Sequence, residues 1–212
     1  MGPRSGPVVL RSAIRWTPAM RNPDGTVRKT RQSVNEPGHA HELTFTCHRG
    51  LPLLSNDRTR QWFVEALDRA RRKLDLELWA YVIMPEHVHV LLLPGQPDYQ
   101  MSAILKTIKQ PVGQRAINFL KTEAPQWLER LEVTWPNGRV EHRFWQQGGG
   151  YDRNIAKPEV AWASVAYIHE NPLRRGLVEA TVAWPWSSAR WYAGDRDVKL
   201  AMDARPPDAP VR

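Results

Sequence analysis

Apolar and polar positions alternate along short runs in the first half of the chain. Residues 42–47 alternate in type and are rich in β-forming residues, which predicts a strand. Residues 57–74 instead carry apolar side chains at helical spacing and predict a helix. Two more β-rich runs, 76–84 and 87–93, are joined by the tight turn Met84-Pro85-Glu86, which indicates an antiparallel pair.

Helical spacing returns twice in the second half of the chain. Residues 101–120 predict a second helix, with a kink at Pro111 because proline removes a backbone hydrogen bond. Residues 159–170 predict a third helix, which Pro172 is expected to stop. Tyr167 falls in the apolar stripe of this helix, and Tyr81 falls in an apolar strand, so both are expected in the core.

A hairpin is predicted between the second and third helices. The runs 131–135 and 139–145 flank Pro136-Asn137-Gly138, and Asn-Gly suits the tight turns of hairpins. The order strand, helix, two strands, helix, strand predicts an α+β fold, with helices packed on one face of an antiparallel sheet.

The two ends of the chain differ in composition from its centre. Residues 1–38 are rich in Arg with scattered Pro and Gly, and predict a flexible basic arm that is either a phosphate-binding tether or a solvated tail. Residues 193–212 are expected to form a flexible tail. This leaves 39–192 as a single folded domain.

The net charge and the cysteine content indicate which partners and which kinds of site the protein can have. The chain holds 30 Lys and Arg against 22 Asp and Glu, a net charge of +8, and nucleic acid is the commonest partner of such a chain. The single cysteine, Cys47, excludes an internal disulfide and zinc sites with several thiolates, and its apolar surroundings place it in the core. No apolar run reaches the roughly twenty residues that cross a bilayer, so a cytoplasmic location is expected.

A pair of histidines is the first candidate for chemistry. His87 and His89 are two residues apart on a predicted strand, so their imidazoles point to the same face. Two imidazoles on one rigid strand make half of a site for a divalent metal. The alternative is a pair of surface histidines on a half-exposed strand.

Four segments, in this order, resemble the single-tyrosine transposases, a family that includes insertion-sequence transposases and REP-associated tyrosine transposases. The histidine pair lies in the first, which resembles the family's histidine–hydrophobic–histidine motif. The segments are 81–92 (YVIMPEHVHVLL), 144–154 (FWQQGGGYDRN), 167–178 (YIHENPLRRGLV) and 184–188 (WPWSS). The resemblance runs from about residue 41 to residue 192 and implies a ferredoxin-like antiparallel sheet.

The resemblance also implies an activity. Enzymes of this family use a tyrosine hydroxyl to attack a phosphate in single-stranded DNA, form a 5′-phosphotyrosine, and depend on a divalent metal, here Mg²⁺ or Mn²⁺. By position Tyr151 matches the nucleophile; the alternative is a turn aromatic packed beside residues 148–150. Related enzymes supply a third metal ligand about one helical turn after the tyrosine, but here Ile155 stands four residues on. Asn154 is the preferred substitute for it, with Asp152, a side chain from 141–146, or water as alternatives.

The expected partner is single-stranded or hairpin DNA such as a REP-type repeat. Arg143, Arg153, Arg174 and Arg175 flank the matching segments and are expected to contact its phosphates. A catalytically inactive, domesticated protein that binds DNA or RNA hairpins is the alternative from another class. A metal phosphodiesterase that uses water instead of tyrosine is a third hypothesis. Monomer and homodimer both stay open.

Overall fold

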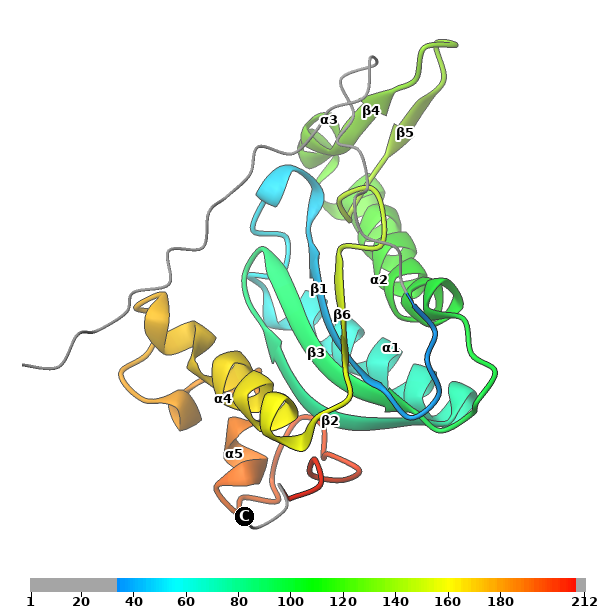
Figure 1. The fold of residues 1–212 in the computed structure, drawn as a ribbon. Coiled ribbons are helices and arrows are strands. Elements are labelled where there is room, and N and C mark those ends of the chain that lie inside the picture. The colour runs from blue at the N-terminus through cyan, green and yellow to red at the C-terminus, as the bar shows by residue number, and fades with distance from the viewer. Residues whose placement is uncertain (1–33, 209–212) are drawn as a thin grey trace, which may run out of the picture. The chain divides into compact units, whose positions relative to one another are not determined.

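The computed structural model describes residues 34–208, and a four-stranded antiparallel sheet lies at their centre (Figure 1). Its strands are β1 (Ala40–Thr46), β2 (Leu76–Ile83), β3 (His87–Pro94) and β6 (Tyr151–Ile155), in the order β2-β3-β1-β6. This order places the first strand between the third and the last, as in ferredoxin-like folds. The predicted α+β class is confirmed.

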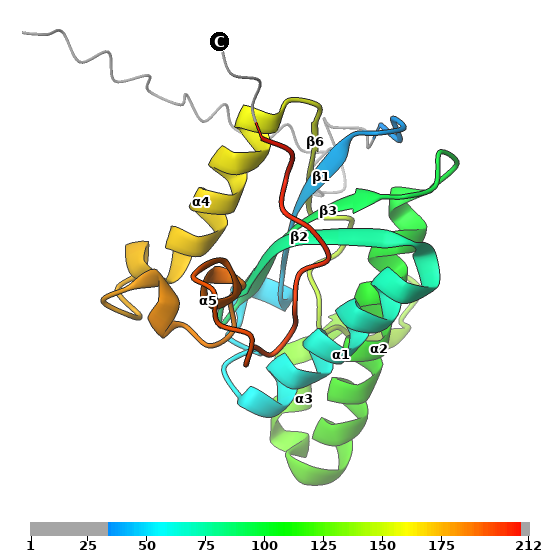
Figure 2. The same cartoon turned by 90° about the horizontal axis from the view of Figure 1, so that it is seen from below.

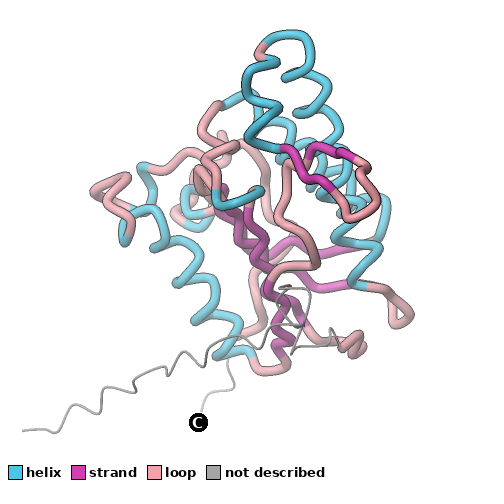
Figure 3. The backbone as a smooth tube through the Cα atoms, turned by 90° about the horizontal axis from the view of Figure 1, so that it is seen from above, coloured by secondary structure: helices cyan, strands magenta, loops and turns pink. Residues whose placement is uncertain are grey.

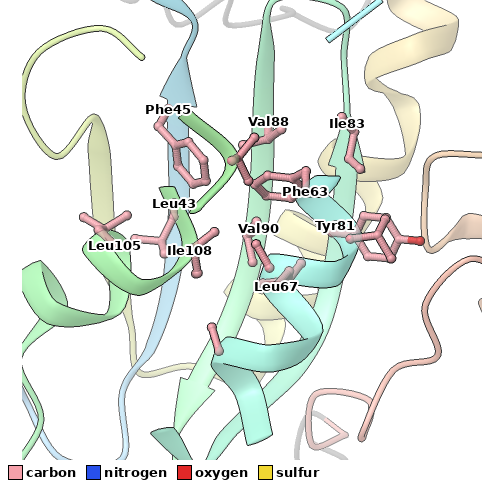
Figure 4. Packing of buried hydrophobic residues seen from close by; sticks show 14 of the residues in the cluster. Leu43, Phe45, Phe63, Leu67, Tyr81, Ile83, Val88, Val90, Leu105 and Ile108 are labelled. Carbon is pink, nitrogen blue, oxygen red and sulfur yellow. The ribbon is translucent and has the colours of Figure 1, made fainter. Parts of the chain in front are cut away.

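Two long helices cover one face of the sheet, and their bounds agree with the apolar pattern. They are α1 (Asp57–Leu74) and α2 (Met101–Glu123), which packs beside α1 and continues through Pro111. Figure 4 shows Phe45, Val88 and Val90 extending from the sheet toward Phe63 and Leu67 of α1. These side chains belong to the larger of two apolar clusters, which also holds Cys47, as predicted.

The third long helix, α4 (Pro158–Arg174), packs on the opposite face of the sheet (Figure 2). Its buried Ala161, Val165 and Ile168 contact Val82 and Leu91 in a second apolar cluster. The expectation that the helices share one face is therefore wrong for α4. The physical reason is that β2 and β3 carry apolar side chains on both faces, so each face needs a cover.

The hairpin and the fourth strand of the sheet are separate elements. Strands β4 (Glu132–Thr134) and β5 (Val140–His142) form a small sheet of their own, with Gly138 at a φ of 79° in the predicted turn. The short helices η2 (Pro125–Trp127) and α3 (Leu128–Leu131) precede it. The strand that follows β1 at the edge of the main sheet is instead β6, which no apolar pattern in the sequence predicts.

Helix α4 does not stop at Pro172, which corrects the predicted end. Pro172 lies inside the last turn, and the helix continues to Arg174. A proline this close to the end removes one of the last backbone hydrogen bonds without interrupting a long ladder. Gly176 then adopts a φ of 65°, as its position after the helix predicts.

The chain after α4 returns to the sheet instead of leaving it. The short helices η1 (His48–Gly50), η3 (Thr181–Ala183) and α5 (Ala189–Tyr192) complete the helices of the described region (Figure 3). Within the expected tail, Leu200 and Met202 are buried in the larger apolar cluster, and the Asp203 carboxylate accepts a hydrogen bond from the Leu78 amide. Residues 1–33 of the expected arm lie outside the described range. No helix between residues 34 and 208 has the length and apolar character needed to span a bilayer.

Candidate functional site

His87 and His89 point toward each other on the α4 side of the sheet. Their Nε2 atoms are 3.1 Å apart. The Nδ1 atom of His89 lies 2.8 Å from the Thr44 hydroxyl, and the Nδ1 atom of His87 lies 3.2 Å from the Glu86 carboxylate. If each Nδ1–H donates to its oxygen, both Nε2 lone pairs face the same point.

Burial keeps both imidazoles in the form that binds metal. His89 is 5% exposed, and burial lowers its pKa to about 3, with the adjacent His87 adding to the effect. Burial also lowers the pKa of His87. Nitrogens bound to one ion at about 2.0–2.1 Å lie roughly 3 Å apart, so the observed separation fits a shared divalent ion.

Helix α4 places two more functional groups beside the histidines. The Tyr167 ring stands edge-on to the His89 ring, with 5.5 Å between their centroids, and is 39% exposed. Asn171, one helical turn on, donates from Nδ2 to the Tyr167 carbonyl, and its side-chain hydrogen bond with His89 raises the His89 pKa against the larger effect of burial. The Asn171 amide therefore lies beside the His89 imidazole. The prediction that Tyr167 is a core residue is wrong.

Tyr151 lies on the same face but farther along the sheet. It pairs with Thr44, and Thr44 pairs with His89, so one strand separates Tyr151 from the histidine. Neighbouring strands are about 4.8 Å apart, which puts the Tyr151 and His89 backbones roughly 10 Å apart. Its side chain is 41% exposed. Tyr151 is therefore within the site region, whereas Tyr167 is in contact with a metal-binding candidate.

Asn154 and Asp152 face away from the histidines, because side chains on a strand alternate between its two faces. Asn154 donates to the Val34 carbonyl at 2.7 Å, and Asp152 bonds to the buried His41 at 2.7 Å. The prediction of Asn154 as third metal ligand is corrected: the sheet itself separates its amide from the histidine pair. The same holds for Asp152.

The four predicted phosphate-binding arginines divide into two pairs. Arg174 and Arg175, at the end of α4, have half-exposed side chains; Arg174 pairs with Glu170 and lies over the Tyr167 ring, and Arg175 pairs with Glu86. Arg153 is held by Glu42 at 2.7 Å and by the Ser164 hydroxyl at 2.9 Å. Arg143 is held by Glu141 and Gln147. Arg174 and Arg175 therefore border the histidine site. Arg143 and Arg153 are instead held by side chains of neighbouring segments.

The side chains around His87 and His89 limit which residue could be a third metal ligand. Among residues 34–208, no group of three or more His, Cys, Asp or Glu side chains is arranged to hold a metal ion. A third protein ligand would therefore be a different kind of oxygen, and the Asn171 amide is the one beside His89. The sequence does carry a signal for it: Asn171 follows Tyr167 by four residues, the spacing of one helical turn.

Two known proteins resemble the chain in sequence or in fold. A protein of Haemophilus influenzae, described as a candidate REP-associated tyrosine transposase, is 24% identical over 157 residues, which are 71% of this chain and 81% of that protein. A solved structure of a REP-associated tyrosine transposase bound to a REP hairpin is 23% identical, with a TM-score of 0.58 over 87% of this chain and 98% of its own.

Two other comparisons add little. A candidate transposase from Deinococcus radiodurans gives a TM-score of 0.41 over 68% of this chain and 97% of its own, at 20% identity. No profile of a known protein family matches the sequence.

The four-stranded sheet that carries the histidine pair has the fold of the solved REP-associated tyrosine transposase. In sequence the chain is similar to a protein described as a REP-associated tyrosine transposase, and in fold it resembles a solved one. The resemblance inferred from the four sequence segments is confirmed.

Proposed function

We propose that the protein is a metal-dependent enzyme that nicks and joins single-stranded DNA at hairpins, such as REP-type repeats. The observation that carries the proposal is the pair of facing Nε2 atoms with the Tyr167 ring standing against one of them. The net charge of +8 and the relative solved on a REP hairpin support DNA as the partner.

His87, His89 and Asn171 are the residues that would hold a divalent ion, Mg²⁺ or Mn²⁺. Such an ion, when bound, neutralises the non-bridging oxygens of a phosphodiester and makes its phosphorus easier to attack. The neutral imidazoles are ready to bind because burial disfavours their protonation.

Tyr167 is the proposed nucleophile. Its hydroxyl oxygen bonds to phosphorus, the bond from phosphorus to the 3′ oxygen breaks, and the proton lost by the phenol balances the one gained by the 3′ oxygen. The product is a 5′-phosphotyrosine and a free 3′-OH, and the reverse reaction joins strands without a nucleotide cofactor. Tyr151 is the second candidate, because it is exposed on the same face.

Arg174 and Arg175 are proposed to contact the phosphates next to the one attacked. Both side chains are half-exposed at the end of the helix that carries Tyr167. Arg143 and Arg153 stay as weaker proposals for DNA contact, since each would have to leave buried or half-buried partners first.

The test is incubation of labelled single-stranded hairpin DNA with the protein and Mn²⁺ or Mg²⁺, followed by a denaturing gel. A protein-linked DNA product that disappears with EDTA and in His87→Ala supports the proposal. Tight binding without cleavage would instead establish an inactive hairpin-binding protein. Cleavage without a protein-linked product would establish hydrolysis by water.

A further inference from the structure

Glu86 stands in the tight turn between β2 and β3, directly before the first histidine of the site. One of its carboxylate oxygens, Oε1, lies 3.2 Å from His87 Nδ1 and 2.9 Å from a guanidinium nitrogen of Arg175. The backbone around it is fixed, because the Glu86 carbonyl accepts a hydrogen bond from the Cys47 amide at 2.8 Å. A single oxygen of a side chain that is 18% exposed therefore joins the turn before the histidine strand to the residue that caps α4.

The contact with His87 determines which of its nitrogens is free. A carboxylate accepts hydrogen bonds, so Nδ1 must carry the proton in this pair and Nε2 keeps its lone pair. That lone pair points at His89 Nε2, where the metal is proposed to bind. A carboxylate behind a metal-binding histidine fixes its tautomer and ring orientation and raises its basicity.

The contact with Arg175 fixes the other half of the site. Arg175 follows the last residue of α4, and its amide bonds to the Asn171 carbonyl. Its ion pair with Glu86 therefore fastens the end of the helix that carries Tyr167 and Asn171 to the strand turn that carries His87. The neighbouring Arg174 cannot do this, because its partner is Glu170 on the same helix.

We infer that Glu86 is a positioning residue that aligns the metal-binding histidine and the helix of the nucleophile through one shared oxygen. The inference rests on the proposed function, since it concerns the same site. Before any DNA is bound, the Arg175 side chain is thus paired with Glu86. Two effects of substitution follow from this role. Removing the Glu86 carboxylate should change the affinity for metal, and the effect of Arg175→Ala on the reaction rate should depend on whether Glu86 is present.

The first test measures Mn²⁺ affinity by calorimetry on the full chain without DNA. Glu86→Ala is expected to weaken binding by about 10- to 100-fold, the usual effect of removing a partner behind a metal ligand. Glu86→Gln keeps an oxygen for His87 and is expected to recover most of the affinity. Arg175→Ala is expected to stay within about threefold of the unaltered protein, because it keeps the backbone bond to Asn171 and removes only a side chain whose ion pair is with Glu86. Arg72→Ala, which breaks an exposed pair with Asp68, is the matched control and should change nothing.

The second test measures the rate at which the protein-linked DNA forms at saturating Mn²⁺. Arg175→Ala is expected to slow this rate more in the unaltered protein than in the Glu86→Ala background, where the ion pair is already lost. Thermal unfolding identifies variants that do not fold. If Glu86→Ala is one of them, Glu86→Gln replaces it in this rate measurement, since the neutral amide keeps the contact with His87 but weakens the one with Arg175.

The outcomes separate this inference from the proposed function. If the unaltered protein binds no Mn²⁺ and forms no adduct, the proposed function fails and the inference fails with it. If it does both, while Glu86→Ala binds Mn²⁺ as tightly and the effect of Arg175→Ala is the same in both backgrounds, the inference alone is overturned.

Discussion

Gly150 is a position where a single added methyl group should disturb the packing of the glycine loop and β6 against β1. Its φ is +82°, and a Cβ built on it would lie 2.2 Å from the Thr44 carbonyl oxygen and 3.1 Å from the Phe45 Cα. Both obstacles are backbone or close to it, so no flexible side chain can move aside. Gly150→Ala must therefore push β6 away from β1, at the point where Tyr151 pairs with Thr44.

Gly138 provides the matched control, because it has a similar φ of +79° and nothing within 4 Å of its built Cβ. An alanine in left-handed backbone costs about 1–2 kcal/mol, partly offset by the lower entropy of the unfolded chain. We therefore expect Gly138→Ala to lose about 1 kcal/mol of unfolding free energy. Gly150→Ala adds an overpacking cost of about 1–3 kcal/mol and should lose about 2–4 kcal/mol.

Thermal unfolding followed by circular dichroism checks this difference. For a chain of this size, about 1 kcal/mol corresponds to about 2–4 °C in Tm, so Gly150→Ala should unfold several degrees below Gly138→Ala. Equal Tm values for the two variants would refute the close contact between the glycine loop and β1.

Three further predictions concern the site and its supports. Asn171→Ala should weaken Mn²⁺ binding in calorimetry, whereas Asn154→Ala, on the far face of the sheet, should leave it unchanged; the reverse result would restore the original sequence prediction. Arg153→Ala should lower the free energy of unfolding in urea by about 2 kcal/mol because it strands a buried carboxylate, whereas Arg174→Ala, in an exposed pair on one helix, should change it by less than about 0.5 kcal/mol. Burial lowers the pKa of His169 to about 4, so the folded state resists its protonation and stability should fall as pH drops from 6.5 toward 4. A His169→Gln variant should show a smaller loss of Tm across that range, and an unchanged loss would contradict this.

Much of the fold could be predicted from the sequence because apolar periodicity is strong where an element is buried. The helix predicted over 57–74 has those bounds in the structure, and the strand pair around Pro85 and the Asn-Gly hairpin are where they were expected. The edge strand β6 is not predicted because it is short and polar, so its five residues, YDRNI, carry no apolar pattern. β6 pairs with β1, which is far away in the sequence, and the spacing of apolar residues does not predict such a long-range pairing.

The candidate site also has a part that local sequence pattern predicts and a part that depends on tertiary packing. His87 and His89 could be paired from the alternation of a single strand, which is a local property. Asn171 and Tyr167 come from α4, which reaches the histidines only because it crosses the opposite face of the sheet. An apolar pattern does not tell which face of a sheet a helix covers. Nearness in sequence to Tyr151 favours Asn154 as a ligand, but side chains alternate along β6, so Asn154 lies on the face opposite to the histidines.

In the proposed reaction, a tyrosine in contact with the histidine pair attacks a DNA phosphate. The most direct measurement isolates the protein-linked DNA formed on a hairpin substrate with Mn²⁺ and maps the modified residue by peptide mass spectrometry. DNA is expected on Tyr167, and the product should be lost in Tyr167→Phe and persist in Tyr151→Phe. DNA on Tyr151, with Tyr167→Phe fully active, would contradict the proposed reaction.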